Sequence, residues 1–340
     1  MRRAKVVFAG RTVEFVDRDR AIRQIEELGE KGTWRVFVVY GPEGCGKTAL
    51  LRQAAEILED ELGYSVIYVN PLAEKVEELL AFTPSIRDIV KEVLGLFPEP
   101  YSRIVDVAVS IASYVVKRLP KPRVAVLMDD IFQAVGLDKA EAYVKTLLNL
   151  IEWPPAEYER IVVLVTSSEG VTRTRVGRHR WAELLTMWNM PWEGFGELYN
   201  LLPEPKPPLE DVWRLTGGNP KALEELYREN WSADRVANKI ILGRGVTYAF
   251  VSKWGRYLEE AVEDPDSLWR GAGEAEKLVE ELVERNLIVF HLPPREEGYW
   301  VDEVPPERDP ELGVGRYVAW QTPLHREAVR RALEQAQGSA

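Results

Sequence analysis

Residues 41–48 of this 340-residue chain have the spacing G-x-x-x-x-G-K-[ST], as Gly-Pro-Glu-Gly-Cys-Gly-Lys-Thr. The apolar run Val36–Tyr40 before it predicts a buried strand, and the amphipathic segment after it predicts a helix. Glycine-permitted turns then aim several N–H groups at phosphate oxygens near a helix N-terminus. Lys47 is expected to reach the β and γ phosphates, and Thr48 to ligate Mg²⁺ through its hydroxyl. The segment therefore predicts a nucleotide site.

The residues expected to contact the nucleotide are the whole loop and the residue after it. They are Gly41, Pro42, Glu43, Gly44, Cys45, Gly46, Lys47, Thr48 and Ala49. Lys47 is assigned to the catalytic set as well. Cys45 occupies a variable position of the motif, so it is expected to be only a small residue that is tolerated there.

A further apolar run, Val124–Met128, ends in the acidic pair Asp129-Asp130. Ligands of open α/β sheets bind at the carboxyl ends of the strands, so the pair is expected at the same site as the loop. Asp129 is expected to hold Mg²⁺, directly or through water. Asp130 is the candidate that orients or deprotonates the attacking water. A solvated turn is the alternative for such a pair, and the phosphate motif disfavours it.

Hydroxyl and arginine side chains follow the next predicted strand. Its end reads Thr166-Ser167-Ser168-Glu169, which places hydroxyls beside the loop if this strand lies between the first and the third. We expect one hydroxyl, with Ser168 as the candidate, to sense the γ-phosphate. Four arginines then occur within eight residues, namely Arg173, Arg175, Arg178 and Arg180. They suit a cis arginine finger, with Arg178 as the candidate, or a phosphate-contacting arm, or else a solvated basic loop.

Strand-like and helix-like segments alternate in the first half, which predicts an α/β fold with a parallel sheet covered on both faces by helices. The strand candidates are continuous apolar runs, typical of strands buried on both sides: Val36–Tyr40, Val66–Val69, Val124–Met128 and Ile161–Val165. Helical spacing is clear over 50–62 and 142–151. Ile104–Val116 is the longest apolar stretch, and the charges in and around it predict a buried helix, not a membrane span.

The proline-dense segment 203–208 predicts a stiff joint between domains. We expect a P-loop core over 1–204, a helical lid over 205–239 and a winged-helix domain over 240–340. The winged helix is predicted from the order of the last elements. They are a helix over 274–285, a strand over 287–290, a long loop, a strand over 317–320 and a helix from Pro323.

Composition narrows the classes of protein. With 46% hydrophobic and 29% charged residues and no leader signature, the chain is expected to be soluble, without a membrane partner, and cytoplasmic. One cysteine and three histidines exclude an intrachain disulfide framework and a zinc-like cluster. Few Cys and Asn with many Glu, Arg and Pro favour a thermophile. Net charge is −11, and residues 240–340 hold 12 basic against 19 acidic residues, which counts against a large nucleic-acid footprint there.

Several of these segments together resemble the archaeal branch of the STAND-class P-loop ATPases, relatives of the AAA+ proteins. Besides the loop, they are Phe15-Val16-Asp17-Arg18, Leu127–Gln133, Thr166-Ser167-Ser168, Gly177-Arg178 and Leu215–Pro220. The resemblance implies a P-loop ATPase core, a helical lid and a winged-helix domain. It also implies that Pro220, in the Gly-x-Pro motif Gly218-Asn219-Pro220 at the start of a lid helix, packs near the base. Arg18 joins the nucleotide-binding set on the same ground.

Two positions depart from the family pattern. Ala21 stands where the N-terminal motif usually has Glu, so one structural contact is missing. Asp130 stands where many archaeal members have Glu, and its shorter side chain draws the carboxylate back by about one methylene. Other branches with Asp-Asp look like nucleotide-held switches, so slow turnover is expected. Adenine is favoured over guanine, because Asn238-Lys239-Ile240-Ile241 lacks the Asp of a guanine-reading motif.

We therefore expect a Mg²⁺-dependent ATP-binding switch with weak hydrolysis, bound to a protein partner through the lid or the winged helix. The alternative is a DNA-associated ATPase resembling origin-recognition-type initiators, with the winged helix and arginine loop on duplex DNA. A scaffold that holds nucleotide without turning it over is a third possibility. Trp181, Trp188 and Trp192 follow the arginines, and either core and interdomain packing or an exposed aromatic partner site explains them.

Overall fold

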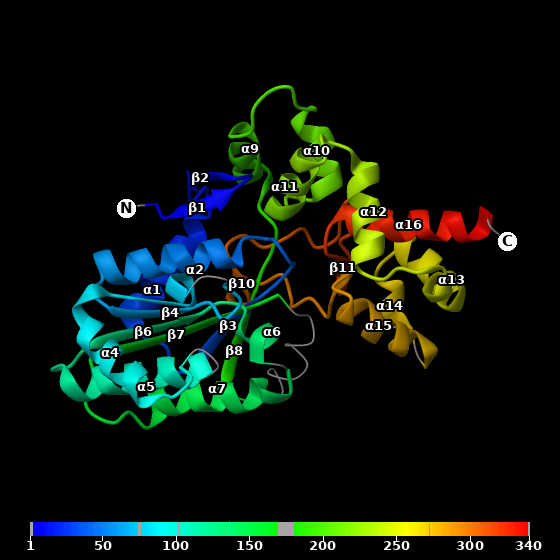
Figure 1. Cartoon of the computed structure of the whole chain (residues 1–340). Coiled ribbons are helices and arrows are strands. Elements are labelled where there is room, and N and C mark those ends of the chain that lie inside the picture. The colour runs from blue at the N-terminus through cyan, green and yellow to red at the C-terminus, as the bar shows by residue number, and fades with distance from the viewer. Residues whose placement is uncertain are drawn as a thin grey trace. The chain divides into compact units, whose positions relative to one another are not determined.

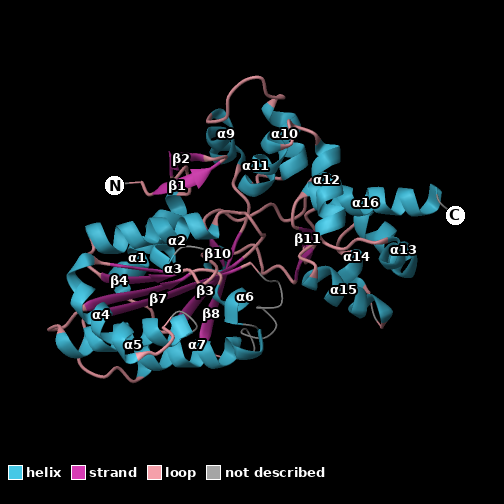
Figure 2. Cartoon of the chain, viewed as in Figure 1, coloured by secondary structure: helices cyan, strands magenta, loops and turns pink. Residues whose placement is uncertain are grey.

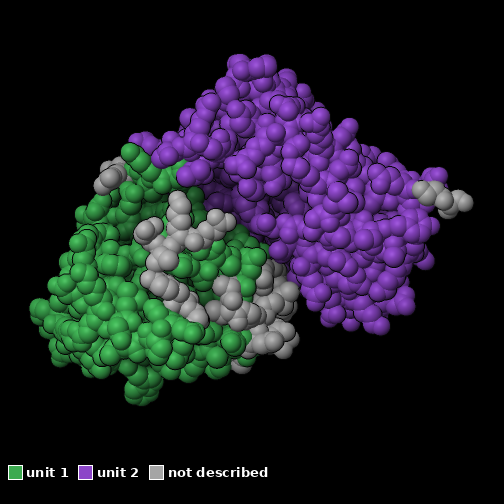
Figure 3. All heavy atoms as spheres, viewed as in Figure 1, with its two compact units in different colours: residues 1–6, 19–40, 47–185 green, residues 7–18, 41–46, 186–340 purple. Residues whose placement is uncertain are grey.

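The structure is a computed structural model that describes residues 3–73, 76–100, 103–135, 137–168, 180–271 and 273–338. The chain forms two compact units (Figure 3). Unit 1 comprises residues 1–6, 19–40 and 47–185, and unit 2 comprises residues 7–18, 41–46 and 186–340. The phosphate loop thus passes from unit 2 to unit 1 between Gly46 and Lys47.

Unit 1 is built on a mostly parallel sheet with the strand order β8-β3-β7-β6-β4-β5 (Figures 1 and 2). The strands are β3 (Val36–Tyr40), β4 (Ser65–Val69), β5 (Leu80–Phe82), β6 (Arg123–Met128), β7 (Arg160–Ser167) and β8 (Ala182–Met187). All four predicted strands form, and β7 lies between β3 and β6 as the site prediction required. The predicted α/β fold class is confirmed. Sequence patterns did not reveal β5, which pairs antiparallel with β4, or β8.

Helices cover both faces of this sheet, with α1 and α2 along one face and α4, α5 and α7 along the other (Figure 1). The helical elements of unit 1 are α1 (Asp19–Lys31), α2 (Lys47–Glu56), η1 (Ile57–Glu61), α3 (Val76–Leu79), η2 (Pro84–Ile86), α4 (Arg87–Leu96), α5 (Ile104–Arg118), α6 (Ile131–Val135) and α7 (Leu137–Glu152). Helix α5 packs its apolar side chains into the core, as predicted. None of the helices in the described part of the chain has the length and apolar character of a membrane span.

Unit 2 is mainly helical. Its helices are α9 (Trp192–Asn200), α10 (Leu209–Thr216), α11 (Pro220–Arg228), α12 (Ala233–Gly243), α13 (Tyr248–Glu263), α14 (Ser267–Arg270), α15 (Glu274–Glu284), η4 (Glu297–Tyr299) and α16 (Pro323–Gly338). The strands β9 (Ile288–Phe290) and β11 (Val318–Trp320) pair antiparallel, and β10 (Trp300–Val301) pairs parallel with the end of β8, residues 186–187. The chain also forms a ribbon of β1 (Lys5–Phe8) and β2 (Arg11–Glu14).

The elements predicted for the end of the chain therefore occur in the expected order, from α15 through β9 and β11 to α16. One apolar core joins α9 to α16 and includes Leu258, Trp320 and Leu324. The predicted domain boundaries at 204 and 239 fall inside unit 2. The lid and the winged helix stay predictions about how this unit is subdivided.

A sharp turn, residues 217–219, joins α10 to α11 and shapes the site described below. Gly217 and Gly218 have φ values of 58° and 79°, a region that glycine adopts readily. A Cβ at Gly218 would lie 2.2 Å from the carbonyl oxygen of Met190, so no larger residue fits there. Asn219 then caps α11 by accepting a hydrogen bond from the backbone N–H of Ala222 over 3.0 Å.

Candidate nucleotide-binding site

The acidic pair lies at the carboxyl end of β6 in unit 1, where Asp129 is only 2% exposed. Its Oδ1 accepts hydrogen bonds from the hydroxyls of Thr166, over 2.6 Å, and Thr48, over 3.2 Å. Its Oδ2 accepts one from the Tyr68 hydroxyl over 3.1 Å. Three neighbouring elements thus fix one carboxylate, with β7, α2 and β4 each contributing a hydroxyl.

The contact between Thr48 and Asp129 fits the chemistry of a magnesium site. A hydroxyl oxygen and a carboxylate oxygen 3.2 Å apart are hard ligands, the kind that Mg²⁺ prefers. Within the described residues, no group of three or more His, Cys, Asp or Glu side chains could hold a metal ion. Magnesium keeps several waters and phosphate oxygens and usually needs only one or two protein ligands.

Asp130 follows in a left-handed backbone conformation, with φ of 48°. Its backbone N–H donates to the Thr166 hydroxyl over 3.0 Å. Its two carboxylate oxygens accept from Ser168, Oδ1 from the backbone N–H and Oδ2 from the hydroxyl, each over 2.9 Å. The role of Ser168 as a γ-phosphate sensor stays a prediction, and in the structure its hydroxyl donates to the candidate base.

In unit 2 the side chain of Arg18, which is 3% exposed, supports the phosphate loop. Its guanidinium donates to the carbonyl oxygens of Cys45, over 2.8 Å, and Trp188, over 3.0 Å, and pairs with Asp302 over 2.7 Å. Asp17 and Arg18 both have positive φ, at 55° and 61°, which costs energy in a non-glycine residue. Burial and the charge of Asp302 raise the pKa of the Asp17 carboxyl. Arg18 thus positions the loop backbone.

The loop also contacts the turn before α11. Asn219 donates from Nδ2 to the carbonyl oxygen of Glu43 over 2.9 Å, and the Lys221 N–H donates to the carbonyl oxygen of Gly44 over 3.3 Å. A Cβ at Gly44, where φ is 77°, would lie 2.1 Å from the Lys221 Cβ. Glycine is therefore required at Gly44 both for its conformation and for this close approach.

Residues from the end of the chain hold Glu43 as well. Gln321, directly after β11, accepts a hydrogen bond on Oε1 from the Glu43 N–H over 2.8 Å. Arg244, after α12, forms an ion pair with the Glu43 carboxylate. The loop is therefore held within unit 2 by residues that lie 278 and 201 positions away along the chain.

The structure describes most of the other predicted residues, and the remainder lie outside the described ranges. Lys47 is buried at 5% exposure and Cys45 is fully buried, while Thr48 is exposed at the start of α2, one residue before Ala49. Pro220 occupies the first turn of α11, between the two residues that contact the loop. Arg178, with Arg173 and Arg175, lies outside the described residues. Arg180 is exposed.

Sequence patterns missed several residues of the site. Tyr68 had a usable signal, because it lies near the end of a predicted strand beside the one that carries Asp129. Lys221 directly follows the Gly-x-Pro motif. The sequence gives no such signal for Asp302, Gln321 and Arg244. These residues lie in segments whose position beside the loop depends on tertiary packing.

Comparison with known proteins gives a family for the chain. A family model described as an ATPase domain predominantly from Archaea matches residues 15–226. The comparison with curated proteins gives no match. The matched segment contains the loop, the acidic pair and the turn before α11.

Solved structures that match the chain include three at low identity. The Aeropyrum pernix ORC2 protein (ADPNP-ADP complexes) is 15% identical, with a TM-score of 0.42 over 95% of this chain and 94% of that chain. The A. pernix ORC1 protein in complex with DNA is 15% identical, with a TM-score of 0.40 over 94% and 93%. C. elegans PCH-2 is 16% identical, with a TM-score of 0.32, and the match covers 53% of this chain and 44% of that chain. The phosphate-loop motif directly follows a strand of the mostly parallel sheet, and the family match covers more than half of the chain. The protein therefore belongs to the family of predominantly archaeal ATPase domains.

Proposed function

We propose that this ATPase is a Mg²⁺-dependent, STAND-type nucleotide switch that binds ATP and ADP and hydrolyses ATP slowly. The observation that carries the proposal is the pair of hydrogen bonds from Ser168 to Asp130. These bonds occupy carboxylate lone pairs that would otherwise orient the attacking water. A candidate base held in this way supports slow turnover.

The bound magnesium ion would supply charge neutralisation at the β and γ phosphates. Thr48 and Asp129 would hold it, with Thr166 and Tyr68 fixing the Asp129 carboxylate. Lys47, next to Thr48 in the same loop, would neutralise phosphate charge. Asp130 would direct the attacking water once its bonds to Ser168 loosen.

The contacts of Glu43 and Gly44 support the conformational part of the proposal. Asn219, Lys221 and Gln321 bond the loop backbone directly, so a nucleotide that moves this backbone also strains those bonds. ADP and ATP shift the conformation only through a difference in their affinity for its two states. Coupling of this kind is typically about 1–3 kcal/mol.

Two measurements test the proposal. They are single-turnover hydrolysis, and protease susceptibility of the 203–208 segment in ADP and in a non-hydrolysable ATP analogue. We expect slow hydrolysis and different cleavage in the two nucleotides. Hydrolysis without a difference in cleavage contradicts the switch, and a complete lack of hydrolysis favours the scaffold. The DNA-associated alternative predicts duplex binding whose affinity falls steeply as salt is added, so titrations at two salt concentrations separate it from the switch.

A further inference from the structure

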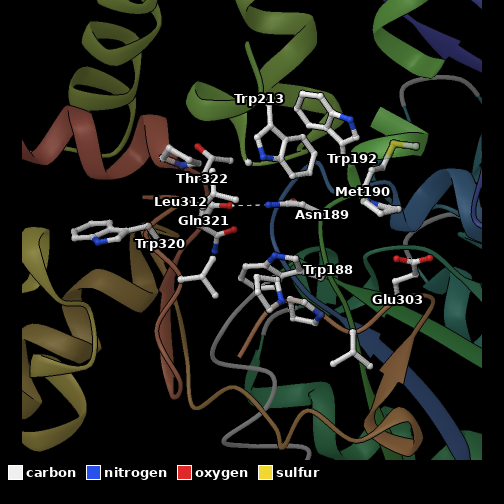
Figure 4. A pocket seen from close by; sticks show the side chains of 17 residues that line it. Trp188, Asn189, Met190, Trp192, Trp213, Glu303, Leu312, Trp320, Gln321 and Thr322 are labelled. Carbon is white, nitrogen blue, oxygen red and sulfur yellow. Dashed lines mark hydrogen bonds between the residues drawn. The ribbon is translucent and has the colours of Figure 1, made fainter. Parts of the chain in front are cut away.

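Unit 2 contains a cavity of about 200 Å³ whose walls are rich in tryptophan and proline (Figure 4). Four tryptophans line it: Trp188 after β8, Trp192 on α9, Trp213 on α10 and Trp320 at the end of β11. Prolines at 191, 305, 306 and 323 complete much of the remaining wall. Binding sites for small molecules have this character, with apolar and aromatic walls and few polar groups.

The charge of the cavity favours a cation. Glu303 is the only charged side chain among the described residues that line the cavity, and it is exposed to solvent. None of the described lining residues is Lys, Arg or His. The face of an aromatic ring carries negative charge density and attracts a cation within about 6 Å of the ring centre. The Glu303 carboxylate and the tryptophan rings therefore both favour a bound cation.

Two polar side chains of the wall are already engaged with the protein. Asn189 donates from Nδ2 to the backbone carbonyl of Gln321 over 3.3 Å, a bond drawn in Figure 4, and accepts on Oδ1 from Asn219 over 2.8 Å. The Trp320 indole donates to the carbonyl oxygen of Ala261 over 3.2 Å. Because these groups are occupied, they offer little to an anion or to a sugar-like ligand that needs many hydrogen bonds.

The aromatic walls are held in place before any ligand arrives. Trp188 is 6% exposed and Trp320 is fully buried, so both are fixed by packing. Trp192 and Trp213 meet edge to face with ring centroids 5.3 Å apart, and Trp192 keeps 40% of its surface exposed. Because packing already fixes Trp188 and Trp320, binding pays less entropy to order this part of the wall.

We propose that this cavity binds an alkylated ammonium group. The same chemistry occurs in a free quaternary ammonium compound and in the methylated lysine side chain of a protein partner. The cation would lie in the cavity beside the tryptophan rings, and the Glu303 carboxylate in the same lining would favour its positive charge.

Occupancy of the cavity would also act on the phosphate loop, an extension that rests on the proposed nucleotide function. Asn189 bonds Asn219, which bonds the Glu43 carbonyl, and Gln321 bonds both Asn189 and the Glu43 N–H. The Arg18 guanidinium donates to the backbone carbonyl oxygens of both Trp188 and Cys45. A ligand that shifts this wall therefore shifts hydrogen bonds to the loop.

Calorimetric titration of the full chain with choline tests the site, with 3,3-dimethylbutan-1-ol as an uncharged ligand of the same shape and sodium chloride to match ionic strength. We expect saturable choline binding and at least about tenfold weaker binding of the alcohol, the order of effect of a desolvated cation–π contact. A peptide with one trimethyllysine and its unmethylated twin form the second arm. Tighter binding of the methylated peptide than of choline identifies a protein partner as the source, and the reverse identifies a free compound.

Matched variants locate the binding. Trp192→Ala and Glu303→Gln should each weaken choline binding about three- to tenfold, because each removes one element of the cation contact. Trp153→Ala is the control, since this tryptophan is 79% exposed and lies in unit 1. Thermal unfolding checks that all three variants fold. Absence of binding in both arms, equal binding of the alcohol, or unchanged affinity in both cavity variants overturns the site.

The link to the loop has its own readout. ADP affinity should change at least about threefold at saturating choline, and choline affinity should change by the same factor at saturating ADP. Unchanged ADP affinity at saturating choline overturns this link. Lys47→Ala should lose nucleotide and keep choline binding, so a failure of the nucleotide function is distinguishable from a failure of the cavity.

Discussion

Ser168 bonds both carboxylate oxygens of Asp130, one through its backbone N–H and one through its hydroxyl, each over 2.9 Å. The candidate base and the candidate sensor are thus a hydrogen-bonded pair. A hydrogen bond to a charged group contributes about 1.5–3 kcal/mol, which is enough to alter a hydrolysis rate several-fold.

Ser168→Ala should raise the single-turnover rate of ATP hydrolysis about three- to tenfold, because loss of the hydroxyl frees one Asp130 oxygen for water. The backbone N–H bond remains, so the loop keeps its position. Rapid-quench measurement at saturating ATP and Mg²⁺ checks this. A slower variant would instead assign Ser168 to the γ-phosphate, as predicted from the sequence.

Asp130→Asn should leave ATP affinity within about twofold and lower hydrolysis by about 10²–10⁴-fold, since it removes the base and keeps the size. Asp129→Asn is the comparison, because it should weaken the Mg²⁺-dependent part of ATP binding. Calorimetry with and without Mg²⁺, paired with single-turnover rates, separates the two roles. Equal loss of binding in both variants would make Asp130 a metal ligand.

Lys47→Ala should abolish measurable ADP binding, because it removes a 5% exposed ammonium from the phosphate loop. Lys31→Ala is a suitable control, since Lys31 ends α1 with its side chain 66% exposed. Calorimetry gives the affinities, and thermal unfolding shows whether the first variant folds. Wild-type ADP affinity in Lys47→Ala would refute the phosphate-binding role.

Gly44→Ala should destabilise the nucleotide-free protein more than Gly63→Ala does. Both glycines have positive φ, at 77° and 68°, so both variants bear the same conformational cost. Only at Gly44 does the new Cβ meet another atom, the Lys221 Cβ at 2.1 Å, whereas nothing lies within 4 Å at Gly63. The excess should be about 1–3 kcal/mol in urea unfolding. Equal destabilisation would mean that the contact with α11 does not persist in solution.

The stability of unit 2 should depend on pH through His325. Burial, followed by the positive charge of Arg244, lowers the pKa of its imidazole from 6.5 to about 3. The unfolded chain therefore binds a proton that the folded chain rejects, and stability falls as pH drops from 6.5 towards 3. The slope is at most about 1.4 kcal/mol per pH unit, and less because the ring borders an open cavity.

Urea unfolding between pH 5 and 7.5 measures this slope. In His325→Gln the slope in the same range should be smaller, because glutamine fills a similar place without titrating. The acidic and basic side chains Glu43, Glu225, Lys221, Arg228, Lys239 and Arg244 border the same cavity and are unchanged in the variant. An identical slope in wild type and variant would assign the pH dependence to other groups.

The sequence alone determined four strands of the sheet in unit 1 and the motifs expected to bind the nucleotide. Continuous apolar runs identify β3, β4, β6 and β7, because only strands buried on both faces need them. The phosphate loop and the pair Asp129-Asp130 are recognisable for the same local reason, since each combines a fixed spacing with a preceding apolar strand.

Only the tertiary structure decided which side chains meet at the site. The bonds from Gln321 to Glu43 and from Arg18 to Asp302 join residues 278 and 284 positions apart, and no local pattern encodes such distances. The tryptophans show the same limit. Their spacing left both packing and exposure open, and packing in unit 2 buries Trp188 while it leaves Trp192 40% exposed beside a cavity. Burial depends on what the rest of the chain places around a residue, and that is a property of the fold.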